Sequence, residues 1–254
     1  MGQIVITGAA SGIGACAADI LSRDGHKIIS VDLKNADVNA DLSTHAGRQQ
    51  AVDEVLNLSG GMIDGLVTAA GLGGHLTDGQ LVARVNYFGT VDLLDGLFPA
   101  LQKSDSARVV AVSSNSAQMV DSPDNPVIQA LLAHDEDKAM ALIGDAPAAS
   151  VYGLSKHAVA RAVRQRAGAW GAANVRLNAI APGQTETPLY AGSRDHPQIG
   201  DLVKQIPIPL NRVAVPEEIA KMICLMLGDD FAYMHGGVLW IDGGTDAVIR
   251  PDGF

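Results

Sequence analysis

The stretch IVITGAASGIG at residues 4–14 decides the fold, because an apolar run leads directly into a glycine-rich turn and then into helical periodicity. Gly8 allows the chain to turn sharply, while Gly12 and Gly14 let the backbone approach a pyrophosphate and let the helix pack on the strand. The helix start also offers N–H groups and the positive end of the helix dipole to phosphate. With a strand before it and a helix after it, the motif predicts a dinucleotide-binding turn rather than incidental glycines at a helix cap.

The rest of the chain alternates strand and helix signals, as a parallel sheet covered by helices requires. Strands are predicted at residues 3–7, 26–32, 63–68, 109–113, 175–180 and 238–241. Helices are predicted at residues 13–22, 47–58, 81–101, 126–144, 151–170 and 216–227. Because 254 residues contain no evident linker or repeat, we expect one α/β domain over residues 1–254, a doubly wound parallel sheet of the Rossmann type.

Two segments interrupt this alternation. Residues 116–149 form an insertion with an apolar helical stretch, which must be buried against the body or against a second subunit. Residues 187–212 contain four prolines and several apolar side chains. We expect this second segment to be a mobile lid that excludes water from the substrate.

Composition and charge exclude several classes of protein. The formal net charge of −10 repels phosphate backbones, so we expect no nucleic-acid partner. No apolar run approaches the roughly 18 residues of a membrane span. Cys16 and Cys224 are far apart in the sequence and no export signal is visible, so we expect reduced thiols and a cytoplasmic location. No His or Cys pattern has ligand spacing, and no metal is expected.

Tyr152 and Lys156 are the strongest candidates for chemistry. Their spacing of four on a predicted helix places both side chains on one face. There the ammonium group can favour the phenolate and lower the tyrosine pKa from about 10. Such a tyrosine can exchange a proton with a carbonyl or alcohol oxygen. Ser114, after the strand at 109–113, can hydrogen-bond the same oxygen; Ser113 is the alternative, because adjacent strand residues face opposite sides.

Asp32 indicates the type of cofactor. It ends the second predicted strand, where an acidic side chain can accept hydrogen bonds from the adenosine ribose hydroxyls. The same charge repels a 2′-phosphate, and Ser11 and Leu33 supply no cation, although Lys34 is close. NAD is therefore favoured over NADP.

These motifs together resemble the short-chain dehydrogenase/reductase family over nearly the whole chain. The motifs are Thr7-Gly8-x-x-x-Gly12-Ile13-Gly14, Ala69-Ala70-Gly71, Asn86, Ser114, Tyr152-x-x-x-Lys156 and Pro182-Gly183. Within the family the chain looks like the bacterial 3α-hydroxysteroid dehydrogenase/carbonyl reductases, through residues 41–44, 85–89, 181–183, 185–188, 241–248 and the insertion. Thr68 departs from the family, which usually has asparagine there.

The resemblance implies NAD(H) and hydride transfer between a secondary alcohol and its ketone. It implies a catalytic tetrad of Asn86, Ser114, Tyr152 and Lys156, in which Asn86 holds a water that links Lys156 to solvent. Ile180 and Pro182 would flank the nicotinamide. The residues expected to bind the cofactor are Gly8, Ser11, Gly12, Ile13, Gly14, Asp32, Asp41, Leu42, Ala70, Gly71, Tyr152, Lys156, Pro182, Gly183, Thr185 and Thr187.

The resemblance also implies a hydrophobic cyclic substrate, such as a 3α-hydroxysteroid or a xenobiotic carbonyl compound. A monoterpenoid or small aromatic alcohol is the alternative, because a fold does not choose its substrate. A non-catalytic NAD(H) sensor would be expected to have lost Tyr152 or Lys156, and this chain keeps both. The resembled enzymes use the region of residues 116–149 at a dimer interface, so we expect a homodimer, with a homotetramer as the alternative.

Overall fold

The computed structural model describes residues 2–120 and 124–253, and within them seven parallel strands form one sheet. The order across the sheet is β3-β2-β1-β4-β5-β6-β7, so that successive strands are added on one side of β1 up to β3 and on its other side from β4 onward. The strands are β1 (Gln3–Thr7), β2 (Lys27–Asp32), β3 (Val38–Asn39), β4 (Gly65–Thr68), β5 (Arg108–Val112), β6 (Arg176–Pro182) and β7 (Val238–Ile241). The predicted doubly wound, Rossmann-type α/β fold is confirmed.

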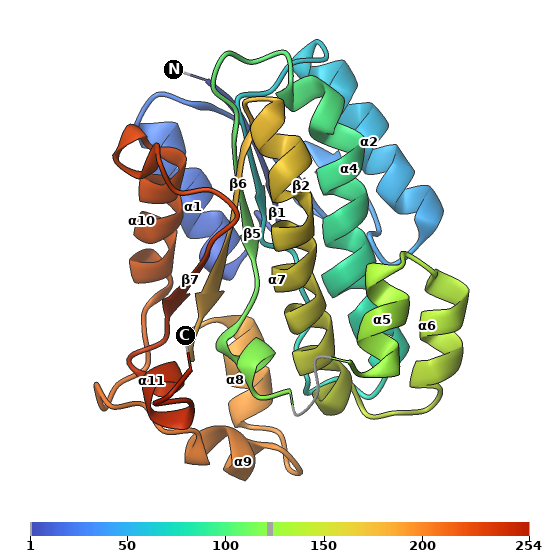
Figure 1. The fold of residues 1–254 in the computed structure, drawn as a ribbon, viewed down its shortest axis with the longest axis vertical. Helices are drawn as coiled ribbons and strands as arrows, with labels where there is room; N and C mark the ends of the chain where they lie inside the picture. The colour runs from blue at the N-terminus through green and yellow to red at the C-terminus, as the bar shows by residue number, and fades with distance from the viewer. Residues whose placement is uncertain (1, 121–123, 254) are drawn as a thin grey trace.

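Helices cover both faces of the sheet. On one face lie α1 (Gly12–Arg23) and α10 (Pro216–Leu227), and on the other α2 (His45–Ser59), α4 (Gly89–Leu101) and α7 (Ala148–Ala172) (Figure 1). Alternate residues of β1 enter different cores: Ile4 and Ile6 pack beneath α1 and α10, and Val5 beneath the other helices. This continuous burial on both faces is characteristic of a parallel sheet. No helix of the described residues is long and apolar enough to cross a membrane.

The shorter elements differ from the sequence-based expectation. β3 was not predicted, because two residues are too few to show a periodic pattern. The helix expected at residues 81–101 is three elements: α3 (Gly79–Ala83), a π-helix (Arg84–Phe88) and α4. Such widened turns are often found at functional sites, and this one carries Asn86. Residues 187–212, expected to be a lid, contain α8 (Pro188–Arg194) and α9 (Gly200–Gln205), and α11 (Thr245–Ile249) lies near the C-terminus.

The insertion folds as two helices rather than one, α5 (Pro126–Leu132) and α6 (Glu136–Ile143). They are separated because His134 adopts a left-handed backbone, with φ of 57°, and Asp135 then caps α6 by accepting a hydrogen bond from the Lys138 N–H. Residues 121–123 of the expected insertion lie outside the described residues.

Most of the apolar surface of the insertion is buried within its own chain. Ile128, Leu131, Ala139, Met140 and Ile143 are all at most 7 % exposed and belong to the core that contains α4 and α7. Burial against the body, one of the two alternatives for this surface, therefore accounts for these residues without a second subunit.

Candidate active site

A cleft of about 850 Å³ opens where the carboxyl ends of the strands meet the loops that follow them. This is the edge at which open α/β sheets bind ligands. Every residue that the sequence predicted for cofactor binding lines it: Gly8, Ser11, Gly12, Ile13, Gly14, Asp32, Asp41, Leu42, Ala70, Gly71, Tyr152, Lys156, Pro182, Gly183, Thr185 and Thr187. Ser114 lines the same cleft, whereas Asn86 lies behind it.

The glycine-rich turn forms one end of the cleft and leaves no room for side chains. Gly8 has a φ of 70°, and a Cβ atom there would lie 2.7 Å from the Ala70 nitrogen. A Cβ atom at Gly14 would lie 2.2 Å from the Gly8 carbonyl oxygen. Ser11, the N-cap of α1, makes no side-chain bond to the helix, so the first-turn N–H groups remain available to an anion. This cradle fits the pyrophosphate of a dinucleotide.

Asp32 lies beside this cradle at the end of β2. Its carboxylate accepts hydrogen bonds from the Ala10 N–H at 3.0 Å and from the Leu33 N–H at 2.7 Å. A carboxylate has about four acceptor positions, so others remain for ribose hydroxyls. Lys34 is exposed and is not among the residues that line the cleft, which leaves the negative charge of Asp32 facing the site.

Lys156 and Tyr152 project from α7 beside the end of β5. Lys156 is 4 % exposed, and its ammonium donates a hydrogen bond to the Val112 carbonyl at 2.9 Å. Burial lowers the pKa of Lys156 to about 8. Burial also raises the pKa of Tyr152, and a hydrogen bond with Ser114 opposes that shift. The expectation of a lowered Tyr152 pKa is therefore wrong for this structure, because desolvation of the phenolate outweighs the groups that favour it.

The two adjacent serines have different partners. The Ser113 hydroxyl donates to the Lys156 carbonyl at 2.8 Å, which ties α7 to β5. The Ser114 hydroxyl hydrogen-bonds Tyr152 and accepts hydrogen bonds from the N–H and hydroxyl of Ser116 at 3.2 and 3.0 Å. Of the two alternatives, Ser114 is thus the serine beside the phenol.

Asn86 is fully buried, and its side chain forms hydrogen bonds with the backbone of Leu72. Its Oδ1 accepts from the Leu72 N–H at 2.7 Å, and its Nδ2 donates to the Leu72 carbonyl at 3.0 Å and to Ser155 Oγ at 3.3 Å. These bonds fix the backbone next to Gly71, which lines the cleft. The water-holding role implied by the resemblance stays a prediction.

Other residues differ from the sequence-based list. Ile180 is 0 % exposed within the core of the α1 and α10 face, so the expectation that it flanks the nicotinamide is not met. Gln184 lines the cleft and was missed; it accepts from the Tyr190 hydroxyl and donates to the Val203 carbonyl. No local pattern distinguishes this glutamine.

The cleft is completed by apolar side chains of α8, α9 and nearby loops, namely Leu72, Met119, Leu189, Ile199, Leu202, Val203 and Ile206.

Comparison with known proteins identifies the family. The family described as short chain dehydrogenase matches residues 3–125, and that described as enoyl-(acyl carrier protein) reductase matches residues 139–246. The chain is 42 % identical over 257 residues to the 3-alpha-hydroxysteroid dehydrogenase/carbonyl reductase of Comamonas testosteroni, with 100 % of both chains covered. The chain belongs to the short-chain dehydrogenase/reductase family. This membership confirms the resemblance seen in the sequence and makes the chain an oxidoreductase.

Two further relatives of this chain bear on its cofactor and its substrate. The structure of the 3-alpha-hydroxysteroid dehydrogenase from Pseudomonas sp. B-0831 in complex with NADH matches with a TM-score of 0.97 and 42 % identity, over 99 % of this chain and 100 % of that one. The cis-4-hydroxycyclohexanecarboxylate dehydrogenase of Sinomonas cyclohexanicum is 28 % identical over 267 residues, with 96 % of each chain covered.

Proposed function

We propose that this enzyme interconverts a secondary alcohol and its ketone with NAD(H). The observation that carries the proposal is one cleft with the glycine cradle and Asp32 at one end and Ser114, Tyr152 and Lys156 at the other. The relative from Pseudomonas, similar over its whole length, is described in complex with NADH, which supports the choice of cofactor.

When held by the glycine cradle and Asp32, NAD(H) would supply or accept a hydride at the substrate carbon. In the direction of reduction, the Ser114 hydroxyl donates a hydrogen bond to the ketone oxygen and polarises it. The Tyr152 hydroxyl gives that oxygen the proton that the alcohol carries. Charged Lys156 offsets part of the desolvation that disfavours the remaining phenolate, and the apolar lid excludes water.

The substrate proposed is a hydrophobic cyclic alcohol or ketone, such as a 3α-hydroxysteroid or a xenobiotic carbonyl compound. The apolar side chains Met119, Leu189 and Leu202 of the cleft fit such a ring system. The names of the Comamonas and Sinomonas relatives both describe enzymes of cyclic secondary alcohols. A monoterpenoid or small aromatic alcohol on the same scaffold is the second candidate.

A panel of cyclic ketones, assayed with NADH and with NADPH, tests the proposal. We expect kcat/KM to be at least about 10-fold higher with NADH, because Asp32 repels a 2′-phosphate. Asp32→Ala should lower the ratio of the kcat/KM values for NADH and NADPH, because it weakens the binding of NADH and removes the charge that repels NADPH. A higher kcat/KM with NADPH would contradict the assignment, and no turnover of any ketone by a protein that binds NADH would favour a sensor.

Residues 187–212 are proposed to close as a lid. α8 is joined to the loop after β4 by the contact of His75 Nδ1 with Ser193 Oγ at 3.2 Å, and Ser193 lines the cleft. Backbone hydrogen exchange in 187–212 should slow when NADH and a substrate analogue bind together, while exchange in β1 stays constant. Unchanged exchange in 187–212 would count against a lid.

A cytoplasmic homodimer is also proposed. The free thiols of Cys16 and Cys224 suit a reducing compartment. Leu142 on α6 remains 44 % exposed and is available to an interface at the insertion. Leu142→Asp should shift the native mass towards monomer, whereas Leu58→Asp, at a residue 49 % exposed on α2, should not. A folded Leu142→Asp variant with unchanged mass would refute this interface.

A further inference from the structure

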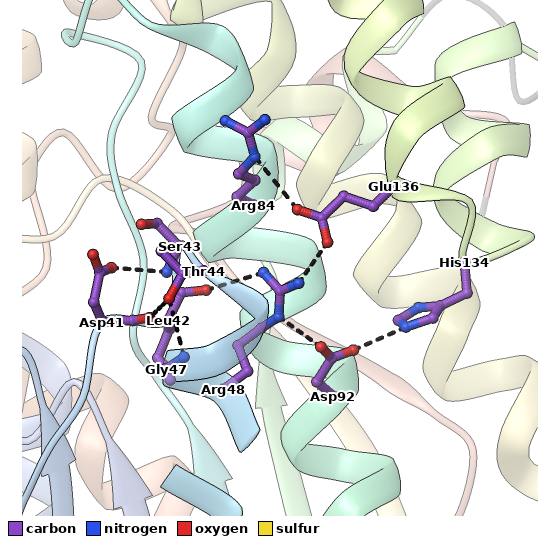
Figure 2. A network of polar contacts seen from close by, with 10 residues as sticks. All are labelled: Asp41, Leu42, Ser43, Thr44, Gly47, Arg48, Arg84, Asp92, His134 and Glu136. Atoms are coloured by element: carbon purple, nitrogen blue, oxygen red, sulfur yellow. Dashed lines mark hydrogen bonds and ion pairs between the residues drawn. The ribbon is translucent and has the colours of Figure 1, made fainter. Parts of the chain in front are cut away.

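Arg48 carries a buried charge at a point where three parts of the chain meet (Figure 2). Its side chain is 1 % exposed, and it heads the largest fully buried side chains of the described residues. Nε donates to Asp92 Oδ2 on α4 at 2.6 Å, and Nη2 donates to Glu136 Oε2 on α6 at 2.5 Å. Nη1 donates to the Leu42 carbonyl at 3.4 Å. One guanidinium therefore joins the body, the insertion and a segment of the cleft.

Stability alone does not explain this arrangement. Replacing a buried ion pair by apolar residues of similar volume is often neutral or stabilising, because both charges lose their hydration. A buried guanidinium does, however, hold several acceptors in one planar geometry. The useful property of Arg48 is thus the position that it imposes on its acceptors.

The acceptor that matters is the Leu42 carbonyl, since Asp41, Leu42 and Ser43 line the cleft at the same end as Asp32. The turn at 41–44 is held by the first turn of α2. Thr44 Oγ1 accepts from the Gly47 N–H at 3.0 Å, and a Cβ at Gly47 would lie 2.0 Å from the Asp41 carbonyl oxygen. Arg48, the next residue of the same helical turn, adds the side-chain hydrogen bond to the Leu42 carbonyl (Figure 2).

The insertion takes part in this network through its own charged residues. Glu136 also pairs with Arg84 of the π-helix, at 3.4 Å, and His134 pairs with Asp92 at 2.9 Å. The Arg48 guanidinium lies over the Phe88 ring, 5.6 Å from its centroid, and that ring also contacts the His134 ring. The insertion therefore supplies one of the two carboxylates that hold Arg48, that of Glu136, and binds the other, that of Asp92, through His134.

We propose that Arg48 is a positioning residue for the adenine end of the cofactor, and that the insertion acts on the cofactor site through it. The ion pairs with Asp92 and Glu136 fix the guanidinium, which fixes the Leu42 carbonyl and with it the turn at 41–44. The inference rests on the proposed NAD(H) function. Because Tyr152 and Lys156 lie at the other end of the cleft, loosening the network should weaken nucleotide binding without slowing the chemical step.

Glu136→Gln tests this with a change on the insertion, outside the residues that line the cleft. We expect the dissociation constants of NADH and of ADP-ribose to rise about 3- to 10-fold, with kcat at saturating NADH within about twofold of the wild type. Binding of nicotinamide mononucleotide, which lacks adenine, should not change. Asp137→Asn, the same loss of charge at the neighbouring exposed position of α6, should leave all of these values unchanged.

Two further variants keep the test decisive. Arg48→Lys retains the charge but lacks the planar guanidinium that reaches three acceptors. It should therefore weaken the binding of ADP-ribose at least as much as Glu136→Gln does. His134→Gln, at a half-exposed residue, carries the test if Glu136→Gln does not fold, with a smaller rise in the same two constants.

Thermal unfolding of each variant distinguishes a role in positioning the cofactor site from a role in the stability of the fold. Variants with a lower melting temperature but wild-type constants for NADH and ADP-ribose would overturn the inference, as would equal weakening of nicotinamide mononucleotide. Those results leave the proposed function intact. A wild-type protein that fails to bind NADH would instead overturn the proposed function, and this inference with it.

Discussion

Replacing Tyr152 by phenylalanine is expected to lower kcat by about 1,000-fold while the dissociation constant for NADH stays within about twofold. The phenol lies beside Ser114 in the cleft and is the proposed proton donor, and phenylalanine keeps the ring and removes only the hydroxyl. The glycine cradle and Asp32, which are proposed to hold the other end of the cofactor, are unchanged. Single-turnover kinetics and a fluorescence titration with NADH measure the two quantities separately.

A second tyrosine of the cleft provides the matched control. Tyr190 on α8 donates its hydroxyl to Gln184 Oε1 at 3.0 Å and lies outside the proposed proton path. Tyr190→Phe should therefore keep kcat within a few-fold of the wild type. If Tyr152→Phe retained a tenth of the wild-type kcat with chemistry rate-limiting, Tyr152 would not be the acid.

Replacing Lys156 by methionine is expected to abolish turnover and to weaken the binding of NADH. The same change is expected to stabilise the fold near pH 7. Burial lowers the pKa of Lys156 from 10.5 to about 8, so below pH 8 the native state holds a charge that it disfavours by about 3 kcal/mol. The Val112 carbonyl loses its hydrogen bond in the variant, which offsets about 1–3 kcal/mol of that gain. A net increase of about 1 kcal/mol in the free energy of unfolding is expected.

The pH dependence gives this prediction a definite sign. Between pH 8 and pH 10.5 the unfolded state binds more protons than the native state, so the wild type gains stability as the pH rises through this range. The advantage of Lys156→Met should therefore be largest at pH 7 and disappear by about pH 10.5. Urea unfolding at both pH values measures it. A variant less stable than the wild type at pH 7 would show that the lost hydrogen bond outweighs the desolvation of the charge.

The sequence by itself determined the fold class, the cofactor cradle and most of the cleft. Gly8, Gly12, Gly14 and Asp32 could be assigned because they follow strands directly, and parallel strands bring their carboxyl ends to one edge of the sheet. The apolar side chains of residues 187–212 were expected to cover the substrate, and Leu189 of that segment lines the cleft. All of these signals are local in the sequence.

Only the tertiary structure decided which serine lies beside Tyr152, that the Tyr152 pKa is raised, and that the insertion packs on its own chain. It also joined Arg48 to Asp92 and Glu136, residues that are distant in the sequence and unremarkable there. The physical reason is that desolvation and ion pairing depend on what surrounds a group in space. A residue pattern records which side chains are present, whereas burial and charge pairing arise only when separate elements pack together.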